Sequence, residues 1–147
     1  MTDPATNPVD LDRLLAGLAT IAVVGLSPRT DRPSHQVAAG LQGLGLAIRP
    51  VRPAVDAVLG EPAVADLSQL PGPVDAVVVF RNPAEVPAIA EATVAGGHGA
   101  LWLQPGAESP EAARIAIEAG IPAVVGRCLW VDYRRRQDNG CNPPLAR

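Results

Sequence analysis

The sequence predicts an α/β fold, a three-layer, Rossmann-like doubly wound arrangement around a mainly parallel sheet. The first observation is a series of short, uninterrupted apolar runs, which are typical of strands buried on both faces. The second is that amphipathic segments with helical spacing, each about ten residues long, alternate with these runs. Because crossovers between parallel strands are right-handed, this alternation places helices on both faces of the sheet.

The first half of the chain contributes two helices and two strands. Leucines at helical spacing predict a short helix over residues 10–18, and the apolar run 20–25 predicts the first strand. A second helix is expected over 34–44, because its apolar residues share one face. The second strand is expected over 46–51, where Pro50 leaves the end of the strand open.

The second half begins with a long, proline-bearing connection over residues 52–73, in which one minor strand is predicted near 63–64. The uninterrupted apolar residues 77–80 make 74–80 the strongest predicted strand. The arginine-rich segment from Tyr133 onward is predicted to be solvated. Between the strand 74–80 and this segment, we expect helices over 84–95 and 110–119 and strands over 100–103 and 123–125.

The composition fits one globular domain. The chain has 147 residues, of which 48% are hydrophobic and 18% charged. We expect a flexible N-terminus over 1–8, a single domain over 9–136 and a flexible tail over 137–147. With only Cys128 and Cys141 as thiols, and no secretory or membrane-spanning run, the sequence predicts a soluble cytoplasmic protein that does not bind membranes.

Charge and residue types argue against several functions. A net charge of −3 and a sequence pI near 5.3 argue against a nucleic-acid binder. All 12 basic residues are arginine, which excludes a Walker A lysine, a Schiff-base lysine and a Ser–Lys nucleophile pair. His35 and His98 are far apart in sequence and are both predicted to lie on the surface, and no metal site is expected.

The loop after the first strand is a candidate phosphate site. It runs from Gly25 to Ser34 and lacks the dinucleotide-binding glycine pattern, because Ser27 stands where the second glycine would be. Its hydroxyls, the following helix N-terminus and the side chain of Arg29 or Arg32 could still bind an anion. The alternative is a surface turn that only starts a helix.

The end of the second strand favours a phosphorylated ribose. NAD-binding sheets carry an acidic residue here, whereas this chain has Arg49 and Arg52 and no acid before Asp56. An arginine at this place suits NADP or coenzyme A (CoA) and disfavours NAD, with Arg52 the stronger candidate. The alternative is that both arginines are solvated.

The remaining strand ends suggest binding rather than chemistry. Arg81 is expected near the crevice, Gln104 can hydrogen-bond a ligand amide, and Gly106 allows close approach of the backbone. No catalytic triad, carboxylate pair or metal cluster emerges, so catalytic residues are not predicted and an enzyme is less expected than a binding protein.

Taken together, these strand-end segments resemble the stand-alone CoA-binding proteins, which are related to the nucleotide-binding domain of succinyl-CoA synthetase alpha subunits and of acyl-CoA synthetases. The similarity covers nearly the whole chain. Each matching motif is weak alone, but the order and spacing of the motifs together are specific to this family. The matching segments are IAVVGLS at 21–27, DRPS at 31–34, PVRP at 50–53, LGE at 59–61, VD at 74–75, VFR at 79–81, LWLQPG at 101–106 and RC at 127–128.

The resemblance implies the CoA-binding variant of the Rossmann-like fold and coenzyme A as the ligand, without established catalytic activity. It implies that the first loop holds the diphosphate, that the end of the second strand lies by the adenosine, and that the next two strand ends face the pantetheine. The ligand-binding residues it implies are Gly25, Leu26, Ser27, Arg32, Pro33, Ser34, Val51, Arg52, Pro53, Phe80, Arg81, Gln104 and Gly106.

The chain departs from the family pattern at three positions. Arg52 stands where the family usually has asparagine, which favours a contact with the 3′-phosphate. Pro105 replaces a hydrophobic residue, and Gly126 often corresponds to an aspartate. Cys128 is taken as a neighbour of the ligand thiol and not as a nucleophile.

Two other functions remain open. One is an NADP-binding, oxidoreductase-like protein, and the other is a subunit of an acyl-CoA synthetase that works with a partner chain. A homodimer is also open, because the sequence does not determine the oligomeric state.

Overall fold

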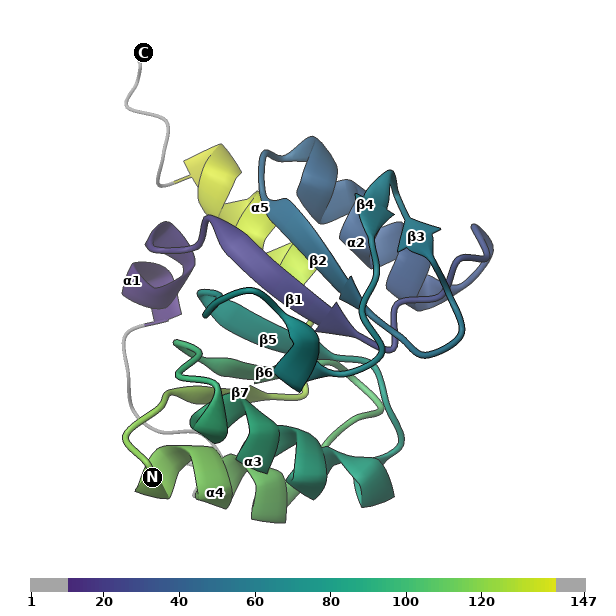
Figure 1. The fold of residues 1–147 in the computed structure, drawn as a ribbon. Coiled ribbons are helices and arrows are strands. Elements are labelled where there is room, and N and C mark those ends of the chain that lie inside the picture. The colour runs from purple at the N-terminus through teal and green to yellow at the C-terminus, as the bar shows by residue number, and fades with distance from the viewer. Residues whose placement is uncertain (1–10, 140–147) are drawn as a thin grey trace.

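The computed structural model describes residues 11–139 and confirms the predicted fold class, with a sheet between two layers of helices (Figure 1). Its strand order is β2-β1-β5-β6-β7, and every neighbouring pair is parallel. The sheet reverses direction of winding at β1 and β5, so the crevice for a ligand is expected beyond their carboxyl ends. The strands are β1 Thr20–Val24, β2 Ala47–Val51, β5 Ala76–Val79, β6 Leu101–Leu103 and β7 Ala123–Val125.

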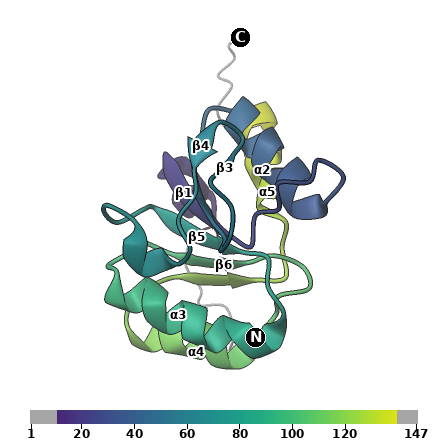
Figure 2. The same cartoon turned by 45° about the vertical axis from the view of Figure 1, so that its right-hand side comes forward.

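Helices cover both faces of the sheet, as Figures 1 and 2 show from two directions. Alternate residues of each strand enter different cores: Ile21 and Val23 pack on the side of α2 and α5, and Ala22 and Val24 pack on the side of α3 and α4. No helix within residues 11–139 is both long enough and apolar enough to cross a bilayer. The helices are α1 Leu11–Ala16, α2 Pro33–Gly43, α3 Val86–Ala95, α4 Pro110–Glu118 and α5 Leu129–Asn139.

The connection between β2 and β5 contains a hairpin that the sequence analysis missed. Strands β3 (Ala57–Val58) and β4 (Glu61–Pro62) are antiparallel and are joined by Leu59 and Gly60, whose φ values of 57° and 79° are those of a type I′ turn. The predicted minor strand near 63–64 is reduced to a single bridge between Val51 and Val64. Two short 3-10 helices complete the fold, η1 Leu67–Gln69 and η2 Pro83–Glu85.

Pro50 does not interrupt β2, because β2 is an edge strand. The carbonyl oxygen of Val51 faces β1 and accepts a hydrogen bond from the N–H of Gly25 at 2.9 Å. Pro50 faces the other side, where it offers only its carbonyl, which accepts a hydrogen bond from the N–H of Val64 at 3.1 Å. An N–H is not needed at that position.

The prediction of a solvated segment from Tyr133 onward holds in part within the described residues, because Arg134 and Arg135 are exposed. The segment nevertheless belongs to α5, which the sequence analysis missed. Leu129 and Tyr133 are buried on one face of the helix. Trp130 packs so closely on Gly40 of α2 that a Cβ at position 40 would lie 2.2 Å from the indole ring. The helix also crosses the predicted domain boundary at 136/137, while residues 1–8 and 140–147, including Cys141, lie outside the described residues.

His98 is also not a surface residue, as the sequence analysis expected, because only 4% of it is exposed. Its Nδ1 accepts a hydrogen bond from the backbone N–H of Val74 at 3.0 Å. This bond requires an unprotonated Nδ1, and burial lowers the pKa of His98 below its ordinary value of 6.5.

The stability of the protein is therefore expected to fall as the pH drops through about 6.5, where the unfolded chain binds a proton at His98 that the native state does not. Urea unfolding at about pH 7.5 and about pH 5.5 measures this loss. In His98→Asn, whose side-chain oxygen can still accept from Val74, the difference between the two pH values should shrink. An equal difference in both proteins would contradict this role of His98.

Candidate functional site

A cleft of about 780 Å³ opens beyond the carboxyl ends of β1, β5 and β6. The loops that follow β1, β2, β5 and β6 all contribute to it, as expected for a doubly wound sheet. The lining residues are Gly25, Ser27, Arg29, Arg32, Pro33, Ser34, Arg52, Pro53, Phe80, Arg81, Asn82, Glu85, Pro105, Gly106 and Ala107.

The loop between β1 and α2 is folded back on the start of α2. The hydroxyl of Ser34 accepts a hydrogen bond from the N–H of Ser27 at 3.0 Å, and the hydroxyl of Ser27 accepts from the N–H of Arg29 at 3.1 Å. Nδ1 of His35 donates to the carbonyl oxygen of Ser27 at 2.9 Å. Arg32, at the N-cap, provides no side-chain cap, so the first turn of α2 keeps backbone N–H groups for an anion.

Gly25 permits the close contact between the ends of β1 and β5. Its φ is +85°, and a Cβ there would lie 2.4 Å from the carbonyl oxygen of Phe80 and 2.9 Å from Cδ of Arg81. Any larger residue would force apart the two strand ends that form the floor of the cleft.

Four arginines line the cleft: Arg29, Arg32, Arg52 and Arg81. Arg29 forms an exposed ion pair with Asp31, and Arg52 donates a long hydrogen bond of 3.5 Å to the carbonyl oxygen of Gly25. Arg32 makes no side-chain hydrogen bond or ion pair with any residue in 11–139. The cleft is thus rich in cationic donors although the whole chain has a net charge of −3.

Arg81 and Glu85 form an ion pair at the border between this cleft and a second cavity. The second cavity, of about 440 Å³, shares Pro53, Arg81 and Glu85 with the cleft. Its other walls are mainly apolar side chains of β1, β2, η1 and α3, which would suit a flat aromatic ring. These residues are Val24, Val51, Ala65, Asp66, Leu67, Ala88, Ile89 and Ala92.

Three of the predicted ligand-binding residues do not line the cleft. Leu26 is fully buried in the core beneath α2, Val51 lines the second cavity, and Gln104 is buried with 2% of its surface exposed. The structure brings the other predicted residues together at the cleft. The sequence analysis did not include Glu85, although its spacing of four residues from Arg81 is that of a helical ion pair.

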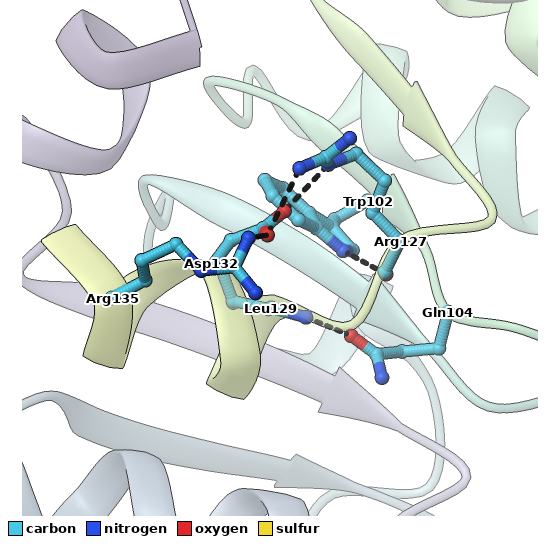
Figure 3. A network of polar contacts seen from close by, with 6 residues as sticks. All are labelled: Trp102, Gln104, Arg127, Leu129, Asp132 and Arg135. Carbon is cyan, nitrogen blue, oxygen red and sulfur yellow. Dashed lines mark hydrogen bonds and ion pairs between the residues drawn. The ribbon is translucent and has the colours of Figure 1, made fainter.

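A polar network joins the end of β6 to the start of α5 (Figure 3). Nε1 of Trp102 donates to the carbonyl oxygen of Arg127 at 2.7 Å, and Oε1 of Gln104 accepts from the N–H of Leu129 at 2.7 Å. Arg127 donates to both oxygens of the buried Asp132, at 2.6 and 3.0 Å, and this bond raises the pKa of Arg127. The network fixes where α5 begins.

Cys128 lies inside this corner but does not line the cleft. Its thiol is free and the residue is half-buried. The backbone carbonyl of Cys128 accepts a hydrogen bond from the N–H of Asp132 at 3.1 Å. Among the residues that the structure describes, no three His, Cys, Asp or Glu side chains are grouped so that they could hold a metal ion.

The chain is similar to known proteins over most of its length. A family model described as a CoA-binding domain matches residues 19–134. The chain belongs to this CoA-binding domain family. It is 37% identical over 129 residues to the uncharacterized protein YneT of Bacillus subtilis (strain 168), a match that covers 86% of this chain and 96% of YneT.

Solved structures similar to this member of the CoA-binding domain family include a protein of similar size and part of a larger chain. The protein cell-free ID.343 from Thermus thermophilus is 38% identical, with a TM-score of 0.80 and coverage of 85% of this chain and 95% of that one. The apo form of a dinucleotide-forming acetyl-coenzyme A synthetase 1 from Ca. Korarchaeum cryptofilum has a TM-score of 0.65 at 24% identity. That match covers 78% of this chain and 27% of the synthetase chain. At this identity it shows a shared fold.

Proposed function

We propose that the protein binds coenzyme A, or an acyl-CoA, in the cleft and has no catalytic activity of its own. The observation that carries this proposal is the cluster of four arginines around an uncapped helix N-terminus. Such a site suits a ligand with several phosphates, because guanidinium groups and helix amides bind phosphate oxygens. Membership of the CoA-binding domain family supports CoA as that ligand.

In this proposal the diphosphate lies on the loop between β1 and α2, beside the free side chain of Arg32. Gly25 and Ser27 provide close approach of the backbone. Arg81, which lies over Gly25, provides a second guanidinium. Two phosphates would thus meet two arginines and the amides of the first turn of α2.

In this proposal the adenosine of CoA lies at the end of β2. The apolar cavity beside Val51 and Pro53 offers a surface for a purine ring. Arg52 lies at the border of the cleft, where its long hydrogen bond to Gly25 leaves most of its donors for a phosphate. Its position fits the 3′-phosphate that distinguishes CoA from dephospho-CoA.

The proposed lack of catalytic activity rests on the residues that line the cleft. Within residues 11–139, the cleft has one carboxylate, Glu85, which is engaged by Arg81, and neither a histidine nor a cysteine lines it. The hydroxyls of Ser27 and Ser34 also line the cleft, but each accepts a hydrogen bond from a backbone N–H, and a serine nucleophile needs an adjacent general base. The fold shared with the acetyl-coenzyme A synthetase from Ca. Korarchaeum cryptofilum favours a second candidate, a subunit that works with a partner chain.

Arg52→Ala is expected to weaken CoA binding by about 1–3 kcal/mol, because a charge-assisted bond to the 3′-phosphate is lost. Isothermal titration with CoA and dephospho-CoA measures this loss, and the variant should no longer distinguish the two ligands. Arg49→Ala is the matched control. It removes the same charge from β2, the strand that Arg52 follows, but Arg49 faces Glu61 and lines neither cavity.

Further titrations and a capture experiment distinguish the candidate functions. Tight binding of NADPH without binding of CoA would contradict the proposal in favour of a nicotinamide cofactor. Equal affinity of the unmodified protein for CoA and dephospho-CoA would contradict the role of Arg52. Capture of a synthetase-like partner chain from native lysate would favour the subunit candidate.

A further inference from the structure

The ion pair between Arg81 and Glu85 lies where the two cavities meet. The cleft and the second cavity share three lining residues, of which two form this pair and the third is Pro53. Arg81 follows β5, and Glu85 is the last residue of η2, four residues later, which is the spacing of a helical ion pair. A molecule that occupies both cavities therefore lies against this pair.

The two cavities differ in chemistry on either side of the pair. Arginines, serines and the start of α2 line the cleft, whereas the walls of the second cavity are mainly apolar. A nucleotide with its phosphates in the cleft and its base in the second cavity crosses the boundary between them. Within the described residues, Glu85 is the only carboxylate that lines the cleft, so a phosphate at this boundary meets a like charge.

Glu85 binds Arg81 in the way that a ligand phosphate would bind it. Carboxylate and phosphate oxygens both accept charge-assisted hydrogen bonds from a guanidinium group. Neither side chain has another hydrogen bond or ion pair with the residues in 11–139. The stem of Arg81 rests on the floor of the cleft, because a Cβ on Gly25 would lie 2.9 Å from its Cδ. The cationic group is thus positioned for an anion but already occupied by one.

The pair is weak enough for a ligand to open it. The side chains of Arg81 and Glu85 are 35% and 44% exposed, and an exposed ion pair contributes little to stability. A phosphate offers Arg81 an acceptor of at least equal charge, and the released carboxylate of Glu85 can turn into solvent. The exchange therefore lowers the affinity for the ligand without unfolding any element.

We propose that the Arg81–Glu85 ion pair is an autoinhibitory contact, in which Glu85 occupies Arg81 until a ligand phosphate replaces its carboxylate. This inference rests on the proposed binding of CoA and extends it to the change that the protein undergoes on binding. In the ligand-free protein the pair separates the cleft from the second cavity. In the complex Arg81 binds phosphate, Glu85 faces solvent, and the two cavities form one site. Ligands that bring no anion to Arg81 leave the pair closed.

Glu85→Gln tests this contact, because glutamine keeps the shape of the side chain but removes its charge. We expect the Kd for CoA, measured by calorimetric titration, to fall about two- to fivefold, since Arg81 no longer has to leave a carboxylate. Glu91→Gln is the matched control. It also removes one negative charge, but Glu91 is an exposed residue of α3 that lines neither cavity. The control should leave the Kd within about 1.5-fold of the unmodified protein.

Arg81→Gln distinguishes competition for Arg81 from simple repulsion between Glu85 and the phosphates. It should weaken CoA binding, and in this background Glu85→Gln should change the Kd no more than Glu91→Gln does. A gain of equal size with and without Arg81 would show repulsion alone and would overturn the inference. Equal Kd values for Glu85→Gln and the unmodified protein would overturn it as well.

The structure of the complex with CoA gives a direct readout, which also applies if Arg81→Gln binds too weakly for titration. It should show a phosphate on the guanidinium of Arg81 and the carboxylate of Glu85 beyond ion-pair distance. An intact pair in the complex overturns the inference and leaves the proposed function correct. If neither the unmodified protein nor any variant binds CoA, the proposed function itself is wrong and the inference falls with it.

Discussion

Replacing Gly25 by alanine is expected to abolish detectable CoA binding and to lower the free energy of unfolding by roughly 2–5 kcal/mol. Two costs combine at this position. A φ of +85° is unfavourable for any residue with a Cβ, and the added Cβ would lie 2.4 Å from the carbonyl oxygen of Phe80. The contact is with backbone, so β1 and β5 themselves must shift. Urea unfolding and titration with CoA measure the two effects.

Gly60→Ala is the matched control for this variant. Gly60 has a similar φ of +79°, but a Cβ there would meet nothing within 4 Å. It should therefore cost only about 1 kcal/mol and leave CoA binding unchanged. If Gly25→Ala proved no more harmful than Gly60→Ala, the close approach of the two strand ends would not matter for the cleft.

The sheet could be predicted from the sequence because its strands are buried on both faces. Such strands are continuous apolar runs, for example 21–24 and 77–79, which do not depend on distant contacts for their recognition. In a parallel sheet the carboxyl ends of the strands meet at one edge. Arg32, Arg52 and Arg81 could accordingly be assigned to one site although they are far apart in the chain.

The elements that sequence reasoning missed depend on tertiary contacts. Helix α5 carries a run of arginines that masks its buried face, and its recognition needs the packing of Trp130 on Gly40. The hairpin β3–β4 has a turn whose first residue, Leu59, is not typical of a positive φ. Its carbonyl is held by a hydrogen bond from Gln42 of α2 at 3.1 Å.

Within the site, sequence reasoning could identify which residue lies at a strand end but not which way its side chain points. Leu26 directly follows Gly25, yet it turns into the core instead of the cleft. The side-chain oxygen of Gln104 accepts a hydrogen bond from the N–H of Leu129, which is 25 residues away in sequence. A single residue of register decides between core and cleft, and only the packed structure supplies that register.

Replacing Trp102, the largest fully buried side chain among the described residues, by alanine is expected to destabilise the protein by about 3–5 kcal/mol. Trp102 is fully buried at the centre of β6, and α5 covers its side of the sheet. The loss has two parts, the cavity left by the indole ring and the unpaired carbonyl of Arg127. The midpoint of urea unfolding, at constant m-value, measures their sum.

Trp102→Phe separates these two parts. Phenylalanine keeps much of the ring volume but cannot donate to Arg127, so this variant should cost about 1–3 kcal/mol, most of it for the lost hydrogen bond. Because the same carbonyl belongs to the network that holds Leu129, the variant should also weaken the anchoring of Gln104. If Gln104 contacts the pantetheine arm, as the family resemblance implies, Trp102→Phe should raise the Kd for CoA more than the Kd for adenosine 3′-phosphate 5′-diphosphate, which is CoA without this arm. Equal changes in both constants would mean that the corner formed by β6, β7 and α5 stabilises the fold without contributing to recognition of the arm.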